Sequence, residues 1–167
     1  MIIVVMGVCG CGKTTVGQAL AAELGWPFFD ADDFHPPENV AKMAAGVPLT
    51  DADRWPWLDR LASELAAIEQ RGAHAVLACS ALRQAYRDRL ARAGDVRFVH
   101  LMGDRATIAE RIGTRSHRYM PLSLLDSQFA ALEPPADAID VDVRWPVAGQ
   151  VAAIRQQLTR HAPGGRP

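Results

Sequence analysis

Hydrophobic residues occur along this chain in two patterns, as short continuous runs and as longer series at helical spacing. A continuous run predicts a strand that is buried on both faces, and a spaced series predicts an amphipathic helix. The predicted strands cover residues 2–6, 26–29, 73–79, 96–102 and 139–143. The predicted helices cover about residues 13–24, 37–45, 53–70, 81–93, 104–112, 124–133 and 146–158.

Strands and helices alternate over the whole chain, and this alternation predicts an α/β fold. We expect a three-layer α/β/α sandwich around a five-stranded parallel sheet. Right-handed crossovers would place the loops after the first three strands around one crevice. Because open α/β sheets bind ligands outside the carboxyl ends of their strands, this crevice is the expected site.

The loop after the first predicted strand fits the phosphate-loop pattern G-x-x-x-x-G-K-S/T, because residues 7–14 read Gly-Val-Cys-Gly-Cys-Gly-Lys-Thr. Its glycines allow backbone N–H groups to approach phosphate oxygens, aided by the dipole of the following helix. We expect Lys13 to reach the β- and γ-phosphates and Thr14 to bind Mg²⁺. The chain has only two lysines, and one of them stands at this motif position. The predicted nucleotide-binding residues are Gly7, Gly10, Cys11, Gly12, Lys13, Thr14 and Thr15.

A cluster of acidic residues follows the second predicted strand, at Asp30, Asp32 and Asp33, and His35 comes directly behind it. These residues lie at the carboxyl end of a strand, so we expect them to point at the site. In an extended segment Asp30 and Asp32 would lie on one side and Asp33 on the other. The sequence therefore predicts a pair of carboxylates near the phosphate loop.

The composition describes an ordinary globular domain, with 167 residues, 49% hydrophobic and 22% charged, and a formal net charge of -1. We expect a single domain over residues 1–160 and a frayed tail at 161–167. This charge balance favours neither nucleic acid nor a membrane surface as a partner, and no apolar run approaches the ~20 residues of a membrane span. The N-terminus does not read as a secretory signal, and three cysteines, two of them in the loop, favour a reducing cytoplasm.

Phosphate-loop proteins include switch GTPases, regulatory ATPases and kinases of small molecules. A switch GTPase usually carries a metal-binding acid at the end of a strand such as 73–79 and an N-K-x-D guanine reader, and this chain has neither. A regulatory ATPase is normally longer. The cationic segment 113–121 instead resembles a kinase lid, in which Arg115 and Arg118 are candidates for the γ-phosphate.

Three longer runs carry a resemblance to a known family. They read FFDADDFHPPENVAKMAAGVPLTDADRWPWL, ACSALRQAYRDRL and LLDSQFAALEPP. They resemble gluconokinases of the phosphate-loop (thermoresistant) family, which are close in fold to shikimate kinases, and the similarity extends from residue 2 to about residue 158. The resemblance implies ATP-dependent phosphorylation of D-gluconate at its 6-hydroxyl, giving 6-phosphogluconate, with ATP and Mg²⁺ as cofactors. It also suggests a homodimer.

The resemblance gives roles to the two carboxylates. Asp32 would accept or orient the proton of the attacking hydroxyl, and Asp30 would hold Mg²⁺ through water. Which acid does which job stays open, and both could instead be turn-forming or capping acids. Arg54 would bind the carboxylate of the substrate, although a surface ion pair with Asp51 or Asp53 is an alternative.

Other residues are expected around the substrate and the nucleotide. The further substrate-binding candidates are His35, Lys42, Ser80, Arg83 and Gln128. Arg87 and Arg89 are expected to face solvent. Arg111 would stack on the adenine. The alternative is that Arg111 is an ordinary arginine on the surface of its helix.

Two features depart from the family pattern. The lid reads His117-Arg118-Tyr119 where the family has Gly-His-Phe, so the role of His117 stays open. Cys9 and Cys11 stand where small residues are usual. They either fill space in the loop as small side chains, or they are thiols whose pKa is lowered by the helix N-terminus and whose oxidation affects activity.

Two alternatives to the gluconokinase interpretation remain. One is a kinase of the same fold for shikimate or another sugar acid, although the chain lacks the glycine triplet that shikimate kinases carry after the third strand. The other is a nucleotide-binding regulatory protein without catalysis, which the intact Lys13, Thr14, Asp30 and Asp32 argue against.

Overall fold

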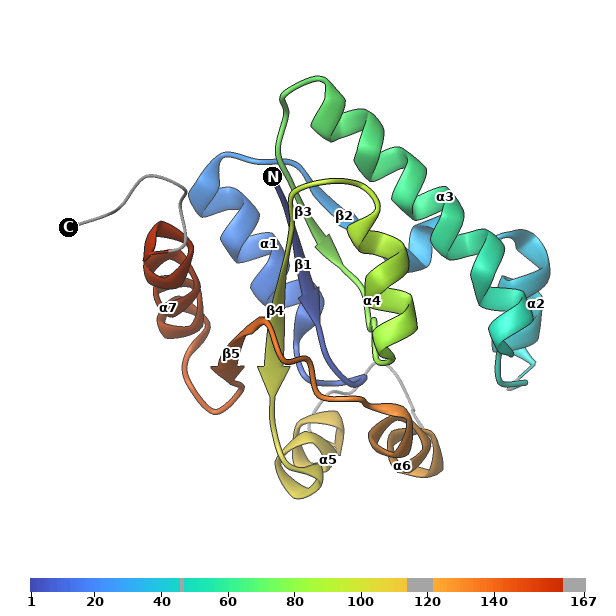
Figure 1. The fold of residues 1–167 in the computed structure, drawn as a ribbon. Helices are drawn as coiled ribbons and strands as arrows, with labels where there is room; N and C mark the ends of the chain where they lie inside the picture. The colour runs from blue at the N-terminus through green and yellow to red at the C-terminus, as the bar shows by residue number, and fades with distance from the viewer. Residues whose placement is uncertain (46, 114–121, 161–167) are drawn as a thin grey trace.

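The computed structural model describes residues 1–45, 47–113 and 122–160 of this chain. Within that part, one parallel sheet has the strand order β2-β3-β1-β4-β5 (Figure 1). The strands are β1 Ile2–Met6, β2 Phe28–Asp30, β3 Ala75–Ala78, β4 Val96–Met102 and β5 Ala138–Asp142. The helices are α1 Lys13–Leu24, α2 Pro37–Ala44, α3 Asp51–Gln70, α4 Gln84–Ala91, α5 Arg105–Gly113, α6 Leu122–Ala131 and α7 Val147–Arg160, and η1 Ala31–Phe34 is a 3-10 helix.

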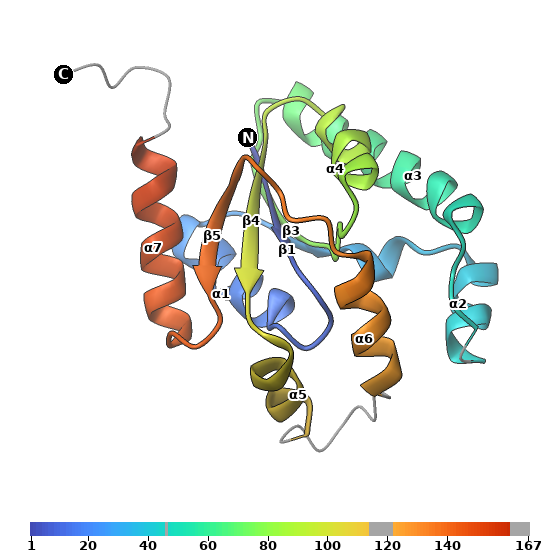
Figure 2. The ribbon, with the colours of Figure 1, turned by 60° about the horizontal axis from the view of Figure 1, so that its bottom comes forward.

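The sheet lies between two layers of helices, as the predicted sandwich requires. Helices α1 and α7 cover one face and α3 and α4 the other, as Figures 1 and 2 show from two sides. Side chains of β1 alternate between the layers: Ile3 and Val5 pack into the α1/α7 core, and Ile2, Val4 and Met6 into the α3/α4 core. Because β1 is buried on both faces, its five residues can all be apolar.

Helices α5 and α6 lie beyond the carboxyl ends of the strands (Figure 1). The same end carries the loops after β1, β2 and β3. The loops after β1 and β3 touch directly, because the Gly7 N–H donates to the Ser80 carbonyl oxygen at 3.3 Å. The loops after β1 and β3, which were expected to border the site, therefore meet at this end of the sheet, where β1 lies between β3 and β4.

The segment after β2 differs from the expected extended strand. It turns into the 3-10 helix η1, and the Asp30 side chain caps this helix by accepting a hydrogen bond from the Asp32 N–H at 3.1 Å. An aspartate that binds the backbone two residues ahead competes with strand pairing. The expected alternation of Asp30, Asp32 and Asp33 along a strand is therefore wrong, although Asp30 remains beside the crevice.

No helix in the described ranges is both long enough and apolar enough to cross a membrane. Helix α3 is long enough, with 20 residues, but it carries many charged side chains.

The start of α3 is fixed by a capping box, in which Thr50 and Asp53 each bind the backbone N–H of the other.

Candidate active site

The phosphate loop joins β1 to α1 through glycines whose backbone conformations other residues rarely adopt. Gly10 has φ 82° and Gly12, the residue before α1, has φ 102°. A Cβ at Gly10 would also come within 2.5 Å of Ile112. Lys13 folds back over the loop, and its Nζ donates to the carbonyl oxygens of Gly7 at 3.1 Å and Val8 at 3.0 Å. The lysine is thus held over the loop that the motif assigns to phosphates.

Thr14 and Asp30 form the next part of the site. The Thr14 hydroxyl donates to Asp30 Oδ2 at 3.1 Å, and this bond joins the first turn of α1 to the end of β2. A hydroxyl and a carboxylate are hard oxygen donors, and Mg²⁺ in such sites takes its other ligands from phosphates and water. The two residues therefore fit a magnesium ion bound together with a nucleotide. The described residues hold no group of three or more His, Cys, Asp or Glu that could bind a metal without such phosphate and water ligands.

Asp32 lies in η1 directly after β2, with 78% of its side chain exposed. His35 lies behind it, with Nε2 at 3.9 Å from Asp32 Oδ1 and only 4% of its side chain exposed. The imidazole stacks on the Trp57 ring at 4.1 Å between centroids. Burial lowers the pKa of His35, and the Asp32 charge opposes this effect only in part. His35 therefore supports the Asp32 segment as a neutral ring.

The arginines Arg54 and Arg83 share one acidic partner. Asp51 accepts from Arg83 Nη1 at 2.9 Å and lies 3.9 Å from Arg54 Nη1. The Tyr86 hydroxyl donates to the same carboxylate at 2.5 Å, and burial together with this bond raises the pKa of Tyr86. Arg54 Nη1 also donates to the Leu49 carbonyl oxygen at 2.6 Å. The structure thus shows the ion pair with Asp51 that the sequence left open for Arg54.

Comparison with known proteins decides the family. A model of the shikimate kinase family matches residues 9–130. The gluconokinase of Gluconobacter oxydans (strain 621H) is 45% identical over 161 residues, covering 95% of this chain and 89% of its own. The thermosensitive gluconokinase of Escherichia coli (strain K12) is 40% identical over 160 residues, covering 93% and 86%. The chain belongs to the gluconokinase family.

Solved structures agree with this family. A gluconokinase from Sinorhizobium meliloti 1021 superimposes with a TM-score of 0.87 and 44% identity, covering 96% of this chain and 92% of that one. A shikimate kinase from Aquifex aeolicus superimposes with a TM-score of 0.65 at 19% identity and so shows the fold alone. The predicted resemblance and fold class are both confirmed.

In this member of the family, several predicted site residues are held by other parts of the protein. Lys42 Nζ lies 2.6 Å from Asp53 Oδ1, within the capping box of α3. This bond and the Thr50 N–H and hydroxyl lower the pKa of Asp53 to about 2. Arg111 donates to the Val143 carbonyl oxygen just after β5. Ser80 follows β3 and binds Gly7 through its carbonyl oxygen.

Gln128 contacts the phosphate loop, which sequence reasoning did not foresee. Its Oε1 accepts a hydrogen bond from the Cys9 N–H at 2.6 Å, so α6 is joined to the loop after β1. The sequence placed Gln128 on the lid and substrate side of the site. No short-range pattern connects residues that are 119 positions apart.

One further sequence expectation is wrong. Arg87 is buried rather than solvent-facing, with 2% of its surface exposed. Its position three residues before the buried Leu90 was the available signal, because residues at i and i+3 share a helix face. For Cys11, which the sequence leaves open between a small filler and an activated thiol, burial raises the pKa of the thiol and favours the filler. Arg115, His117 and Arg118 lie outside the described residues.

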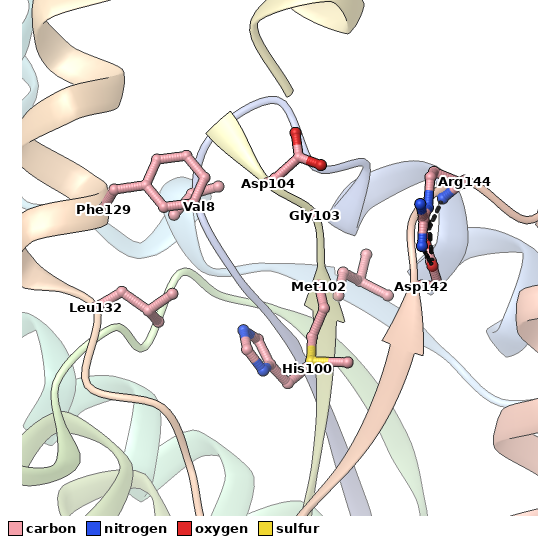
Figure 3. A pocket seen from close by; sticks show the side chains of 10 residues that line it. Val8, His100, Met102, Gly103, Asp104, Phe129, Leu132, Asp142 and Arg144 are labelled. Carbon is pink, nitrogen blue, oxygen red and sulfur yellow. Dashed lines mark hydrogen bonds and ion pairs between the residues drawn. The ribbon is translucent and has the colours of Figure 1, made fainter. Parts of the chain in front are cut away.

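A separate hollow of about 340 Å³ opens beside the phosphate loop at the ends of β4 and β5 (Figure 3). Its lining is Val8, His100, Leu101, Met102, Gly103, Asp104, Phe129, Leu132, Asp142 and Arg144. Asp142 and Arg144, which are two residues apart, are bonded to each other on one side of the hollow (Figure 3), and Asp142 Oδ2 lies 2.5 Å from Arg144 Nη2. None of the predicted substrate-binding residues lines it, so this hollow is distinct from the crevice at Asp32.

Proposed function

We propose that this protein is a gluconokinase, which transfers the γ-phosphoryl group of ATP to the 6-hydroxyl of D-gluconate. The observation that carries the proposal is that the phosphate loop with Lys13, the Thr14–Asp30 pair and the exposed Asp32 lie at the carboxyl ends of β1 and β2 in one parallel sheet, in a chain up to 45% identical to the gluconokinases cited above. Shikimate kinases share only the fold at this level of identity.

Electrostatic effects in the protein support this grouping. The thiol of Cys79, at the end of β3, has its pKa raised to about 12 by burial, and the charges of Lys13, Asp30 and Asp32 all act on it. His35 in turn responds to the charges of Asp32 and Arg54. These shared electrostatic effects support the proposed grouping of the phosphate-binding, metal-binding and acceptor-binding candidates.

The proposed reaction uses each group in a defined role. Lys13 and the loop N–H groups bind the phosphates of ATP, and Thr14 and Asp30 hold Mg²⁺, which neutralises phosphate charge. Arg54 and Arg83 bind the carboxylate of gluconate, so that its other end reaches the phosphate loop. Asp32 accepts or orients the proton of the 6-hydroxyl as the new oxygen–phosphorus bond forms and the bond from the γ-phosphorus to the ADP oxygen breaks.

The remaining substrate and lid residues complete this proposal. His35, Lys42, Ser80 and Gln128 would contact or support the hydroxyls of the sugar acid. Arg115 and Arg118, in the proposed lid at 113–121, would neutralise the γ-phosphate, and Arg111 would contact the adenine. We further propose that residues 1–160 act as a single domain, as a homodimer in the cytoplasm.

The test is ATP consumption with Mg²⁺ across D-gluconate, shikimate, related sugar acids and nucleoside monophosphates. We expect ADP to form rapidly only with gluconate, matched one to one by 6-phosphogluconate in a dehydrogenase-coupled assay. Turnover of another sugar acid in preference would reassign the substrate. ATP binding without turnover of any acceptor would favour the regulatory alternative, and sedimentation of the same sample measures the oligomeric state.

A further inference from the structure

The guanidinium of Arg87 is buried beneath the loop that leads out of β3. Its Nη1 donates to the carbonyl oxygens of Ala81 and Leu82, each at 3.0 Å. Its Nη2 donates to Gln84 Oε1 and to the Glu133 carbonyl oxygen, each at 2.8 Å. One planar side chain thus joins the loop at 81–84 to the connection between α6 and β5, and the fork geometry of arginine is what allows four such bonds.

The loop that Arg87 holds contains an unfavourable backbone conformation. Ala81 has φ 42°, and among the described residues it is the one non-glycine with a positive φ. An L-residue adopts this conformation only where its surroundings impose it, and such residues cluster at functional sites. The two carbonyl groups at and just after this position both bind Arg87, so the guanidinium is placed to impose the conformation.

The same loop carries two of the predicted acceptor-binding residues. Ser80 directly precedes Ala81, and its carbonyl oxygen binds the Gly7 N–H of the phosphate loop. Arg83 follows two residues later, directly precedes α4 and donates to Asp51 at 2.9 Å. A change of φ at Ala81 would redirect the chain between Ser80 and Arg83. The position of Ala81 therefore determines the relative placement of both side chains.

We propose that Arg87 is a positioning residue, which holds Ala81 in its left-handed conformation and thereby orients Ser80 and Arg83 toward the acceptor substrate. This inference rests on the proposed gluconokinase activity. Arg87 acts from beneath the loop, and its bonds are to the protein rather than to the substrate. It determines KM for the acceptor more than it determines the chemical step.

The first test is Arg87→Lys, which keeps the charge but cannot make the forked set of bonds. A loop displaced by an ångström can cost up to about 100-fold, so we expect KM for gluconate to rise about tenfold or more. The kcat and the KM for ATP should stay within about threefold, since the phosphate loop keeps its own contacts. The matched control is Arg89→Lys on the same helix, which disrupts a pair with Asp59 on α3 and should leave KM for gluconate unchanged.

The second test is to add Ala81→Gly to the Arg87→Lys variant. Glycine adopts positive φ without the steric cost that alanine has, so the loop regains its conformation more often. We expect KM for gluconate to return part of the way to the wild-type value. If Arg87 only stabilised the fold, Arg87→Lys would lower the melting temperature, but KM for gluconate would neither rise selectively nor recover with Ala81→Gly.

Hydrogen exchange provides a readout that does not depend on the substrate. Amides of residues 79–84 should exchange faster in Arg87→Lys than in Arg89→Lys. An unchanged KM for gluconate in a folded Arg87→Lys variant, or unchanged exchange at 79–84, would overturn the inference. Absence of gluconate turnover by the wild type would overturn the proposed function, and the exchange comparison would still decide whether Arg87 holds this loop.

Discussion

The Thr14 hydroxyl donates a hydrogen bond to Asp30 Oδ2 at 3.1 Å, and so joins the phosphate loop to the carboxyl end of β2. Switch GTPases usually take a metal-binding acid from a strand in the position of β3, but here Cys79 and Ser80 follow β3 and supply no carboxylate. Asp30 is the last residue of β2, the strand next to β3, and it lies in register with Ala78. The sheet thus brings a carboxylate to Thr14 from β2.

Substitution of Asp30 by asparagine should weaken the binding of Mg²⁺. Asparagine keeps an oxygen that can accept from the Asp32 N–H, so the η1 turn is retained while the negative charge is lost. Loss of a carboxylate beside a metal typically costs about 10- to 100-fold in metal affinity. We expect the free Mg²⁺ for half-maximal rate to rise by that factor at saturating ATP and gluconate. An unchanged Mg²⁺ dependence would remove Asp30 from the metal site.

Substitution of Asp32 by asparagine should lower kcat while ATP binding is retained. A positioned general base typically contributes about 10² to 10⁴-fold, and Asp32 is the exposed carboxylate at the crevice. Steady-state kinetics and titration with ATP measure the two effects separately. The matched control is Asp33→Asn, which removes the neighbouring exposed acid of the same turn. Near-normal kcat in Asp32→Asn would show that this acid is not the base.

The strands and long helices were predictable because their apolar periodicity reports burial directly. The predicted 2–6, 13–24 and 96–102 agree with β1, α1 and β4 to the residue. The segment after β2 was not predictable in this way. Its conformation depends on one side-chain bond from Asp30 to the backbone of Asp32, which apolar periodicity does not report.

The site was predictable where a motif fixes both residue type and neighbourhood, as in the phosphate loop. It was not predictable where a long-range contact decides the role of a residue. The spacing to Leu90 could indicate that Arg87 is buried, but it could not indicate that Arg87 binds the Glu133 carbonyl oxygen 46 positions away. Gln128 likewise meets Cys9 only because the fold brings α6 over the end of β1. Sequence spacing carries no information about either pair.

Replacement of Trp57 by phenylalanine should destabilise the protein without removing its aromatic contact with His35. The indole Nε1–H donates to the Ala31 carbonyl oxygen at 2.9 Å in a buried position. Phenylalanine leaves that carbonyl without its donor, which typically costs about 1–3 kcal/mol. Urea denaturation should show a decrease of this size in the free energy of unfolding. A smaller decrease is expected for Trp55→Phe, since Trp55 is only half-buried and its edge contact with Tyr86 persists.

The pH dependence of stability should carry a contribution from His35. Burial lowers its pKa below the usual 6.5, and the groups that act on it are Asp32, which raises the pKa, and Arg54, which lowers it. The unfolded chain therefore binds a proton at a higher pH than the folded protein does. It follows that the stability due to neutral His35 is complete above about pH 6.5 and decreases as the pH falls from there toward the pKa of the folded state.

The variant His35→Phe keeps a ring on Trp57 but cannot titrate, so it isolates this contribution. Between about pH 7.5 and 5, the wild type should lose free energy of unfolding faster than the variant, by at most about 1.4 kcal/mol per pH unit. Asp53 does not interfere in this pH range. Its pKa is lowered from 3.8 to about 2 in the folded protein, so the stability that its charge contributes is lost only as the pH falls below about 3.8. Urea denaturation at several pH values gives both curves. Parallel curves through this range would mean that His35 has the same proton affinity in the folded and unfolded states.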